Sequence, residues 1–134
     1  MHHWLASTLF AICLTSFSMG AHAYSGSATP AAVGATQVGV ASYYSDRFQG
    51  RRTANGERYD RNDLTAVHPH LPFGTLIRVT NLRNNQSVEL RINDRTHLRR
   101  GRLLDVSKRA ARELGFIGAG LARVEIEILR YGDS

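Results

Sequence analysis

The sequence is poor in cysteine, lysine and tryptophan. Of its 134 residues one is Cys, one is Trp and Lys108 is the only lysine, so the positive charge comes almost entirely from arginine. The single cysteine, Cys13, lies in an apolar stretch near the start of the chain. The chain after that stretch contains no cysteine, so it can form no disulfide and offers no thiol. Its fold therefore depends on a hydrophobic core. No Gly-rich phosphate loop and no Gly-x-Ser-x-Gly elbow is present, which removes the commonest nucleotide-binding and esterase patterns.

The first 23 residues also lack charge. Residues 1–23 contain no Lys, Arg, Asp or Glu and end in "AHA", which is a small-x-small cleavage signal. We interpret them as a secretory signal peptide cleaved after Ala23, although His2 and His3 stand where Lys or Arg is usual. A membrane anchor is the alternative, but the apolar run is shorter than the roughly 20 residues that span a bilayer. Ile12 before Cys13 does not fit a lipidation signal, so we expect an exported protein of the periplasm or cell envelope without a lipid anchor.

The rest of the chain predicts one domain. Residues 24–36 are small, uncharged and rich in Gly, Ala and Pro, which indicates a flexible leader. We expect the folded domain over residues 37–130 and a C-terminal tail over residues 131–134. The net charge of +6 suits an anionic partner such as nucleic acid, anionic lipid or a wall polymer. Export argues against nucleic acid, and we expect a monomer with no stable membrane span after signal cleavage.

Short alternating segments dominate the domain. "TLIRVTN" places Leu76 and Arg78 on one face of a strand and Ile77 and Val79 on the other. "SVELRIN" predicts that Val88, Leu90 and Ile92 face inward while Glu89, Arg91 and Asn93 face outward. "LRNNQ" between these strands suits a hairpin turn. "ARVEIEIL" predicts an inward row of Val124, Ile126 and Ile128, and "QVGVASYYS" and "GRLLDV" are further strand candidates.

One helix is predicted. "SKRAARELG" begins with Ser107, a good N-cap, and ends with Gly115, a good residue to follow a helix C-terminus. Ala110, Ala111 and Leu114 form its apolar stripe. Short strands with turns between them and one small helix favour a compact β-barrel over a sandwich.

Three polar residues stand at the ends of predicted elements. Glu57 follows the Asn55–Gly56 turn, His68 follows "LTAV", and Asp94 ends "SVELRIN". Strand ends place side chains at a barrel mouth, where a cleft can form. Each residue also has an ordinary structural explanation as an exposed turn carboxylate, a loop hydrogen-bond partner or an Asx-turn. The His-x-His pair in "HPH" is not a specific metal signal, and we predict no metal and no cofactor.

The order of several motifs identifies a family. "GVASYYSDRFQGRRTANGERYD", "LTAVHPHLPFGTLIRVTNL", "SVELRINDR" and "GRLLDVSKRAARELG" occur in the order of the RlpA-like barrel. The chain resembles the RlpA family of septal ring lytic transglycosylases over about residues 38 to 129. That resemblance implies a mainly β fold, a six-stranded double-psi β-barrel with one or two short helices.

The resemblance also implies an activity and its residues. The family cleaves the MurNAc–GlcNAc β-1,4 bond of peptide-poor peptidoglycan strands without water and leaves 1,6-anhydro ends. Its functional positions fall on Glu57, His68 and Asp94, which we predict to be catalytic and to share a cleft. Asp105 in "LLDVS" resembles a position of related expansins and cellulases. The residues predicted to bind substrate are Tyr43, Tyr44, Asn93, Arg95 and Asp105.

This chain departs from the family pattern. Thr96 and His97 replace the usual Gly-Pro after "NDR", and Tyr43 stands where Trp is common. No lipobox is apparent, and we expect no C-terminal SPOR domain, so targeting to denuded glycan is not implied.

Chemistry favours Asp94 as the acid/base, with Glu57 and His68 tuning it. In a lytic transglycosylase the C6 hydroxyl of the sugar attacks, so one group can protonate the leaving oxygen and accept the hydroxyl proton. The assignment between Asp94 and Glu57 stays open, as do two other functions on the same barrel. These are an expansin-like module that binds polysaccharide without cleaving it, and a glycoside hydrolase that activates water.

Overall fold

The protein is described by a computed structural model over residues 30–133. The predicted signal peptide, residues 1–23, and the predicted leader up to residue 29 lie outside the described residues. The first strand begins at Thr36, the last residue of the predicted leader, and the last strand ends at Arg130. No helix in the described part is long and apolar enough to cross a membrane.

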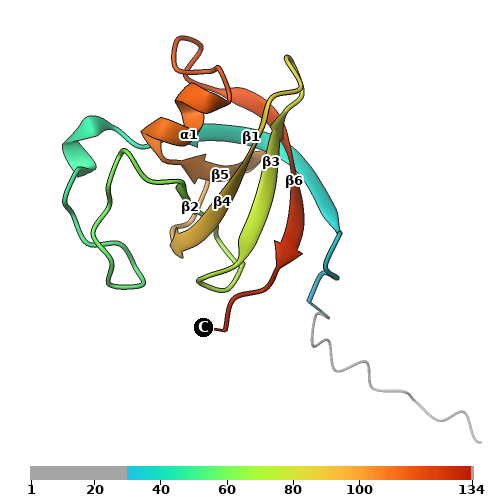
Figure 1. The fold of residues 1–134 in the computed structure, drawn as a ribbon, viewed down its shortest axis with the longest axis horizontal. Coiled ribbons are helices and arrows are strands. Elements are labelled where there is room, and N and C mark those ends of the chain that lie inside the picture. The colour runs from blue at the N-terminus through green and yellow to red at the C-terminus, as the bar shows by residue number, and fades with distance from the viewer. Residues whose placement is uncertain (1–29, 134) are drawn as a thin grey trace, which may run out of the picture.

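Strands are the main regular elements of the described chain, and two short helices accompany them (Figure 1). In chain order the elements are β1 (Thr36–Tyr43), the 3-10 helix η1 (Asp46–Phe48), β2 (Thr65–Val67), β3 (Leu76–Asn81), β4 (Ser87–Asp94), β5 (Arg102–Val106), α1 (Lys108–Glu113) and β6 (Ala122–Arg130).

The six strands close into a barrel in the order β1-β5-β2-β4-β3-β6. Two neighbouring pairs, β1 with β5 and β2 with β4, are parallel, whereas the other four pairs are antiparallel. Closure leaves no free sheet edge in the ring, which removes the usual site of strand-to-strand aggregation. The predicted six-stranded double-psi β-barrel is confirmed.

Local sequence explains the antiparallel part of the barrel. β3 and β4 form a hairpin in which Asn85 adopts a positive φ of 59°, a conformation that Asn tolerates in tight turns. Ile77 and Val79 of β3 are buried, as their alternation predicts. Val124, Ile126 and Ile128 are buried along β6, which also confirms the predicted inward row.

The predicted outward position of Asn93 is wrong. Its side chain is only 2% exposed, and Ile92 beside it is fully buried. The pairing of β2 with β4 shifts register, since Ala66 pairs with Ile92 but Val67 pairs with Asp94. The extra residue in β4 is Asn93, so strict alternation fails there. The bulge buries Asn93 and sets the direction of Asp94 at the strand end.

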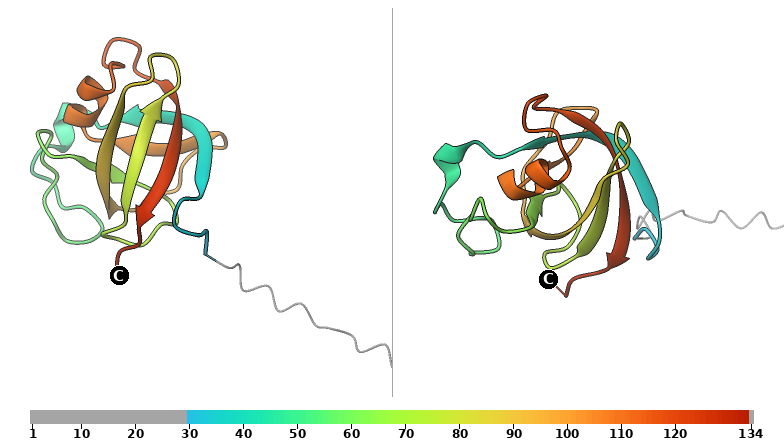
Figure 2. Two further views of the ribbon diagram at one scale, coloured as in Figure 1. Left: turned by 45° about the vertical axis from the view of Figure 1, so that its right-hand side comes forward. Right: turned by 45° about the horizontal axis from the view of Figure 1, so that its top comes forward.

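The helix α1 covers one end of the ring of strands (Figure 2). Ser107 caps it, since the Ser107 hydroxyl accepts a hydrogen bond from the Ala110 N–H, and Gly115 follows the helix with φ 76°. Ala110, Ala111 and Leu114 are fully buried in the barrel core, which confirms the predicted stripe. Most of the rest of that core is formed by side chains from all six strands, including Ala41, Ala66, Ile77, Leu90, Leu104 and Ile126.

Candidate functional site

A cleft of about 570 Å³ opens where β1, β2, β4 and β5 end. We call it the aromatic cleft. Its aromatic lining is Tyr43, Tyr44, Phe48 and Tyr59, and its polar lining includes Arg51, Arg52, Thr53, Asp94, Arg95 and Asp105. Aromatic faces beside acidic and basic groups are suited to a polar ligand with apolar ring faces, such as a saccharide.

Asp94 is the best-held carboxylate of this cleft. Its Oδ1 accepts hydrogen bonds from the N–H of Ala54 at 2.8 Å and the N–H of Arg95 at 2.8 Å. Its Oδ2 accepts one from the Tyr44 hydroxyl at 2.5 Å. Burial, and then the bond to Asp94, raises the pKa of Tyr44 well above 10, so Tyr44 stays a donor. These contacts fix the carboxyl group in one orientation at the cleft.

Glu57 lies beside the aromatic cleft, in the turn that contacts Asp94. Gly56 allows this turn because its φ is 92°, a conformation that side chains with a Cβ avoid. The Glu57 carboxylate pairs with Arg91 Nη1 at 2.6 Å and accepts a bond from Asn93 Nδ2 at 3.2 Å. The hydrogen bond to Arg91 is the main reason why the pKa of Glu57 is below its usual 4.5. Glu57 is therefore ionised at neutral pH.

The imidazole of His68 faces a different pocket from Asp94. The backbone N–H of His68 donates to the Asp94 carbonyl oxygen at 3.3 Å, but its ring is 3% exposed and lines the second pocket. We call this second pocket the end pocket; it lies between Gln37 on β1, Leu103 on β5 and the loop 68–72. Burial lowers the pKa of His68 to about 4, so the ring is neutral.

The expectation of one shared cleft is therefore met only for Asp94. The turn that carries Glu57 and the backbone of His68 both contact Asp94 or its strand end. Their side chains, however, are not among the residues that line the aromatic cleft. Sequence spacing cannot predict which pocket a side chain lines. The direction of the Glu57 and His68 side chains depends on the conformation of the loops that carry them.

Arg95, Asn93 and Asp105 differ in how they relate to the cleft. Arg95 Nη1 donates to the carbonyls of His68 at 2.9 Å and Leu71 at 2.6 Å, so its guanidinium fastens the loop after β2. Asn93 is buried and holds Glu57. Asp105 lines the cleft and pairs with Arg102 at 2.8 Å, and it also accepts a hydrogen bond from Ser42.

The two predicted aromatic residues line the cleft and are also packed. The Tyr43 hydroxyl donates to the Ile117 carbonyl at 2.8 Å, and its ring meets Phe116 edge-on. The Tyr44 ring stacks on Tyr59 with centroids 4.2 Å apart. These contacts hold both rings rigidly, which lowers the entropy lost when a ligand stacks on them.

Sequence reasoning missed several residues of the cleft. Phe48 and Tyr59 complete the aromatic wall. The Ser42 hydroxyl donates a hydrogen bond to Asp105. Thr53 is 6% exposed, and the one proton of its hydroxyl is shared between Asn55 Oδ1 at 2.7 Å and the Glu57 carbonyl oxygen at 2.9 Å, so it shapes the turn. An aromatic residue in a loop carries no pattern that separates a cleft wall from a core, so nothing in the sequence marked Phe48 or Tyr59. Among the described residues, no group of three or more His, Cys, Asp or Glu is placed to hold a metal ion.

Comparison with known proteins gives a consistent match over the barrel. The family described as lytic transglycolase matches residues 36–126. The endolytic peptidoglycan transglycosylase RlpA of Campylobacter jejuni is 45% identical over 106 residues, which cover 79% of this chain and 38% of that protein. RlpA of Neisseria meningitidis is 50% identical over 99 residues, which cover 74% of this chain and 41% of that protein. The chain thus spans about two fifths of the length of these relatives.

Solved structures share the fold at low identity. A Streptomyces papain inhibitor matches with a TM-score of 0.60 at 19% identity, over 73% of this chain and 97% of its own. An expansin of Clavibacter michiganensis matches with a TM-score of 0.58 at 23% identity, over 75% of this chain and 53% of its own. At these identities the likeness concerns the barrel and not what it does.

Proposed function

Because the chain belongs to the lytic transglycolase family and its curated relatives are RlpA proteins, we propose that it cleaves peptidoglycan glycan strands as a lytic transglycosylase. The bond is the MurNAc–GlcNAc β-1,4 linkage of peptide-poor strands, cut within the strand and without water. One observation carries the proposal: the oriented carboxyl group of Asp94 lies in a cleft walled by rigid aromatic rings.

The reaction needs one proton-transfer group. As the bond from C1 of MurNAc to O4 of GlcNAc breaks, Asp94 gives a proton to that leaving oxygen. The C6 hydroxyl of the same MurNAc then bonds to C1, and its proton returns to Asp94. Asp94 ends in its starting form, no water is consumed, and the product carries a 1,6-anhydro end.

Position favours Asp94 over Glu57, because Asp94 lines the aromatic cleft and Glu57 does not. Glu57 is an ionised partner of Arg91 with a lowered pKa, so it is a poor proton donor at neutral pH. In our proposal Glu57 holds the turn whose Ala54 N–H orients Asp94. His68 acts as a positioning residue through its backbone bond to Asp94. Tyr43, Tyr44 and Asp105 contact the sugar. Arg95 also lines the aromatic cleft, where its guanidinium holds the loop after β2, and the buried Asn93 holds Glu57.

The first prediction concerns Asp94. We expect Asp94→Asn to lower the rate on purified peptide-free glycan by about 10²-fold or more, because the amide keeps the shape but cannot exchange the proton. Mass spectrometry of the products gives the readout, since anhydro ends are lighter than reducing ends by one water. Full activity in Asp94→Asn would exclude the role given to Asp94.

The same digest separates the alternatives. Reducing ends from the unmodified protein would identify a glycoside hydrolase. In a hydrolase of this kind, about 6.5–9.5 Å between the two carboxyl groups leaves room for the attacking water. Binding of glycan without any soluble product would identify an expansin-like module. Glu57→Gln is the matched carboxyl variant. We expect this variant to retain more activity than Asp94→Asn, because Glu57 only holds the turn that orients Asp94.

Compartment and assembly are part of the same proposal. We propose an exported protein of the periplasm or cell envelope, released by cleavage after Ala23, with an unlipidated barrel that acts as a monomer. The net charge of +6 supports an anionic wall polymer as the partner.

A further inference from the structure

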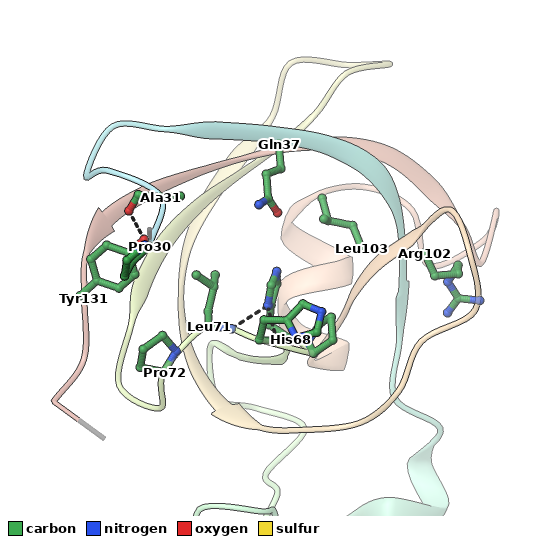
Figure 3. Close-up of a pocket in the computed structure, with 11 residues that line it drawn as sticks. Pro30, Ala31, Gln37, His68, Leu71, Pro72, Arg102, Leu103 and Tyr131 are labelled. Atoms are coloured by element: carbon green, nitrogen blue, oxygen red, sulfur yellow. Dashed lines mark hydrogen bonds between the residues drawn. The ribbon is translucent and has the colours of Figure 1, made fainter. Parts of the chain in front are cut away.

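The end pocket is larger than the aromatic cleft and shares no lining residue with it. Its volume is about 850 Å³, against about 570 Å³ for the aromatic cleft. Figure 3 looks into it within the ring of strands, with Gln37 and Leu103 across from His68, Leu71 and Pro72. This size is within the range of small-molecule sites in proteins. The mechanism proposed for the aromatic cleft makes no use of this space.

His68 brings an unused donor to the end pocket. Its Nδ1 accepts hydrogen bonds from the N–H of His70 at 3.0 Å and the N–H of Leu71 at 2.9 Å. Because the ring is neutral and Nδ1 is an acceptor, the proton is on Nε2. This Nε2 is buried and has no hydrogen-bond partner among the described residues.

The orientation of the ring follows from these bonds. They hold Nδ1 against the loop, so Nε2 lies at the opposite edge of the ring, toward the Gln37 side of the pocket (Figure 3). A buried donor without an acceptor is unfavourable, because it has lost its hydrogen bond to water. A ligand that supplies an acceptor at this point would restore a hydrogen bond.

The rest of the lining defines what such a ligand looks like. Leu71, Pro72, Leu103 and the Tyr131 ring provide mainly apolar walls. No Asp or Glu belongs to the lining, and Arg102 at its edge carries a second buried donor, Nε, without a partner in the described chain. Arg102 pairs with Asp105 through Nη2, so the His68 Nε2–H is the donor that defines the ligand. With no acidic side chain in the lining it favours an acceptor oxygen, and the walls favour an apolar body.

We propose that the end pocket is a second binding site, for a small molecule with an apolar body and a carboxylate or amide oxygen that accepts the Nε2–H of His68. This site is separate from the site of glycan cleavage, since no residue lines both the end pocket and the aromatic cleft. Its failure in the test below would leave the lytic reaction untouched, and loss of the lytic reaction would leave this site untouched.

The test uses three probes with one apolar body. The protein, isotopically labelled, is titrated with 4-phenylbutanoate, 4-phenylbutanamide and 4-phenylbutylamine at neutral pH, and its NMR resonances are followed. We expect the acid or the amide to move the His68 Nε2–H resonance and to bind about tenfold more tightly than the amine, which has no acceptor. The acid and amide arms decide whether the acceptor is charged or neutral.

Two variants of one strand provide the control. Gln37→Trp puts a large ring into the end pocket, whereas Val38→Trp adds the same bulk next to it at a residue that is 47% exposed and outside the lining. We expect Gln37→Trp to abolish probe binding and Val38→Trp to leave it unchanged. The proposal is overturned if the amine binds as well as the acid and amide, if none of the three moves the His68 resonance, or if both variants bind equally.

Discussion

At the scale of single residues, the surroundings of a side chain decide its role more than its type does. Asp94 and Glu57 are both carboxylates at or beside the aromatic cleft. Asp94 accepts hydrogen bonds from two backbone N–H groups and from the Tyr44 hydroxyl, whereas Glu57 forms an ion pair with Arg91. His68 is buried and uncharged: burial is the main cause of its lowered pKa, and His70 and Arg95 act in the same direction. The sequence named all three residues, but Tyr44 and Ala54 on Asp94, and Arg91 and Asn93 on Glu57, come from segments distant in the chain.

The buried His68 should make the stability of the protein pH-dependent. The pKa of His68 is lowered from 6.5 to about 4 in the folded protein, so between these values the unfolded chain binds more protons. Stability is therefore fully present above pH 6.5 and falls as the pH decreases toward 4, by up to about 3 kcal/mol from this group. Urea unfolding over this pH range measures it.

His68→Asn isolates the effect, because the Asn oxygen can replace Nδ1 as the acceptor for the loop N–H groups while nothing titrates. We expect its stability to change less with pH than that of the unmodified protein. His97→Asn, at an exposed histidine, is the control and should keep the full dependence. Identical pH profiles for His68→Asn and the unmodified protein would contradict a neutral buried His68.

At the scale of elements, alternation predicted most strands but not their irregularities. Ile77, Val79 and the inward row of β6 were predicted correctly, since each follows the period of two. Asn93 was not, because its burial results from the register shift between β2 and β4. A bulge depends on the partner strand, which a single strand's pattern does not contain.

The cap of α1 is the element most open to a direct test. Ser107 is fully buried; its hydroxyl donates to the Asp63 carbonyl at 2.5 Å and accepts from the Ala110 N–H at 3.3 Å. We expect Ser107→Ala to lower the free energy of unfolding by about 1–2 kcal/mol, because the helix loses its cap and the Asp63 carbonyl loses its donor.

Chemical denaturation gives this value, with Ser87→Ala at an exposed position of β4 as the control. A change in Ser107→Ala no larger than that of the control would show that α1 is held by its apolar stripe alone.

At the scale of the whole molecule, closure of the barrel and net charge act together. The parallel pairs β1–β5 and β2–β4 bring strand ends from both halves of the chain to one place, and the aromatic cleft forms there. The net charge of +6 favours the approach of polyanions to the protein.

Salt should therefore weaken binding to the proposed substrate. Peptide-free glycan carries the lactyl carboxylates of MurNAc, whereas a chito-oligosaccharide of the same length is neutral. Raising the salt from about 0.1 M to 1 M shortens the screening length from about 10 Å to 3 Å. We expect affinity for the glycan to fall and affinity for the chito-oligosaccharide to stay nearly constant, as measured by calorimetry. Equal salt dependence for both would show that charge plays no part.

The sequence by itself determined the barrel and the main candidates of its site. Period-two alternation requires one buried face per strand, Ser107 and Gly115 delimit the helix, and Glu57, His68 and Asp94 stand at element ends. Only the tertiary structure decided that Asp94 lines the aromatic cleft while the His68 ring faces the end pocket. The physical reason is that these directions depend on register, on the Asn93 bulge and on hydrogen bonds between segments far apart in the chain, which no local pattern encodes.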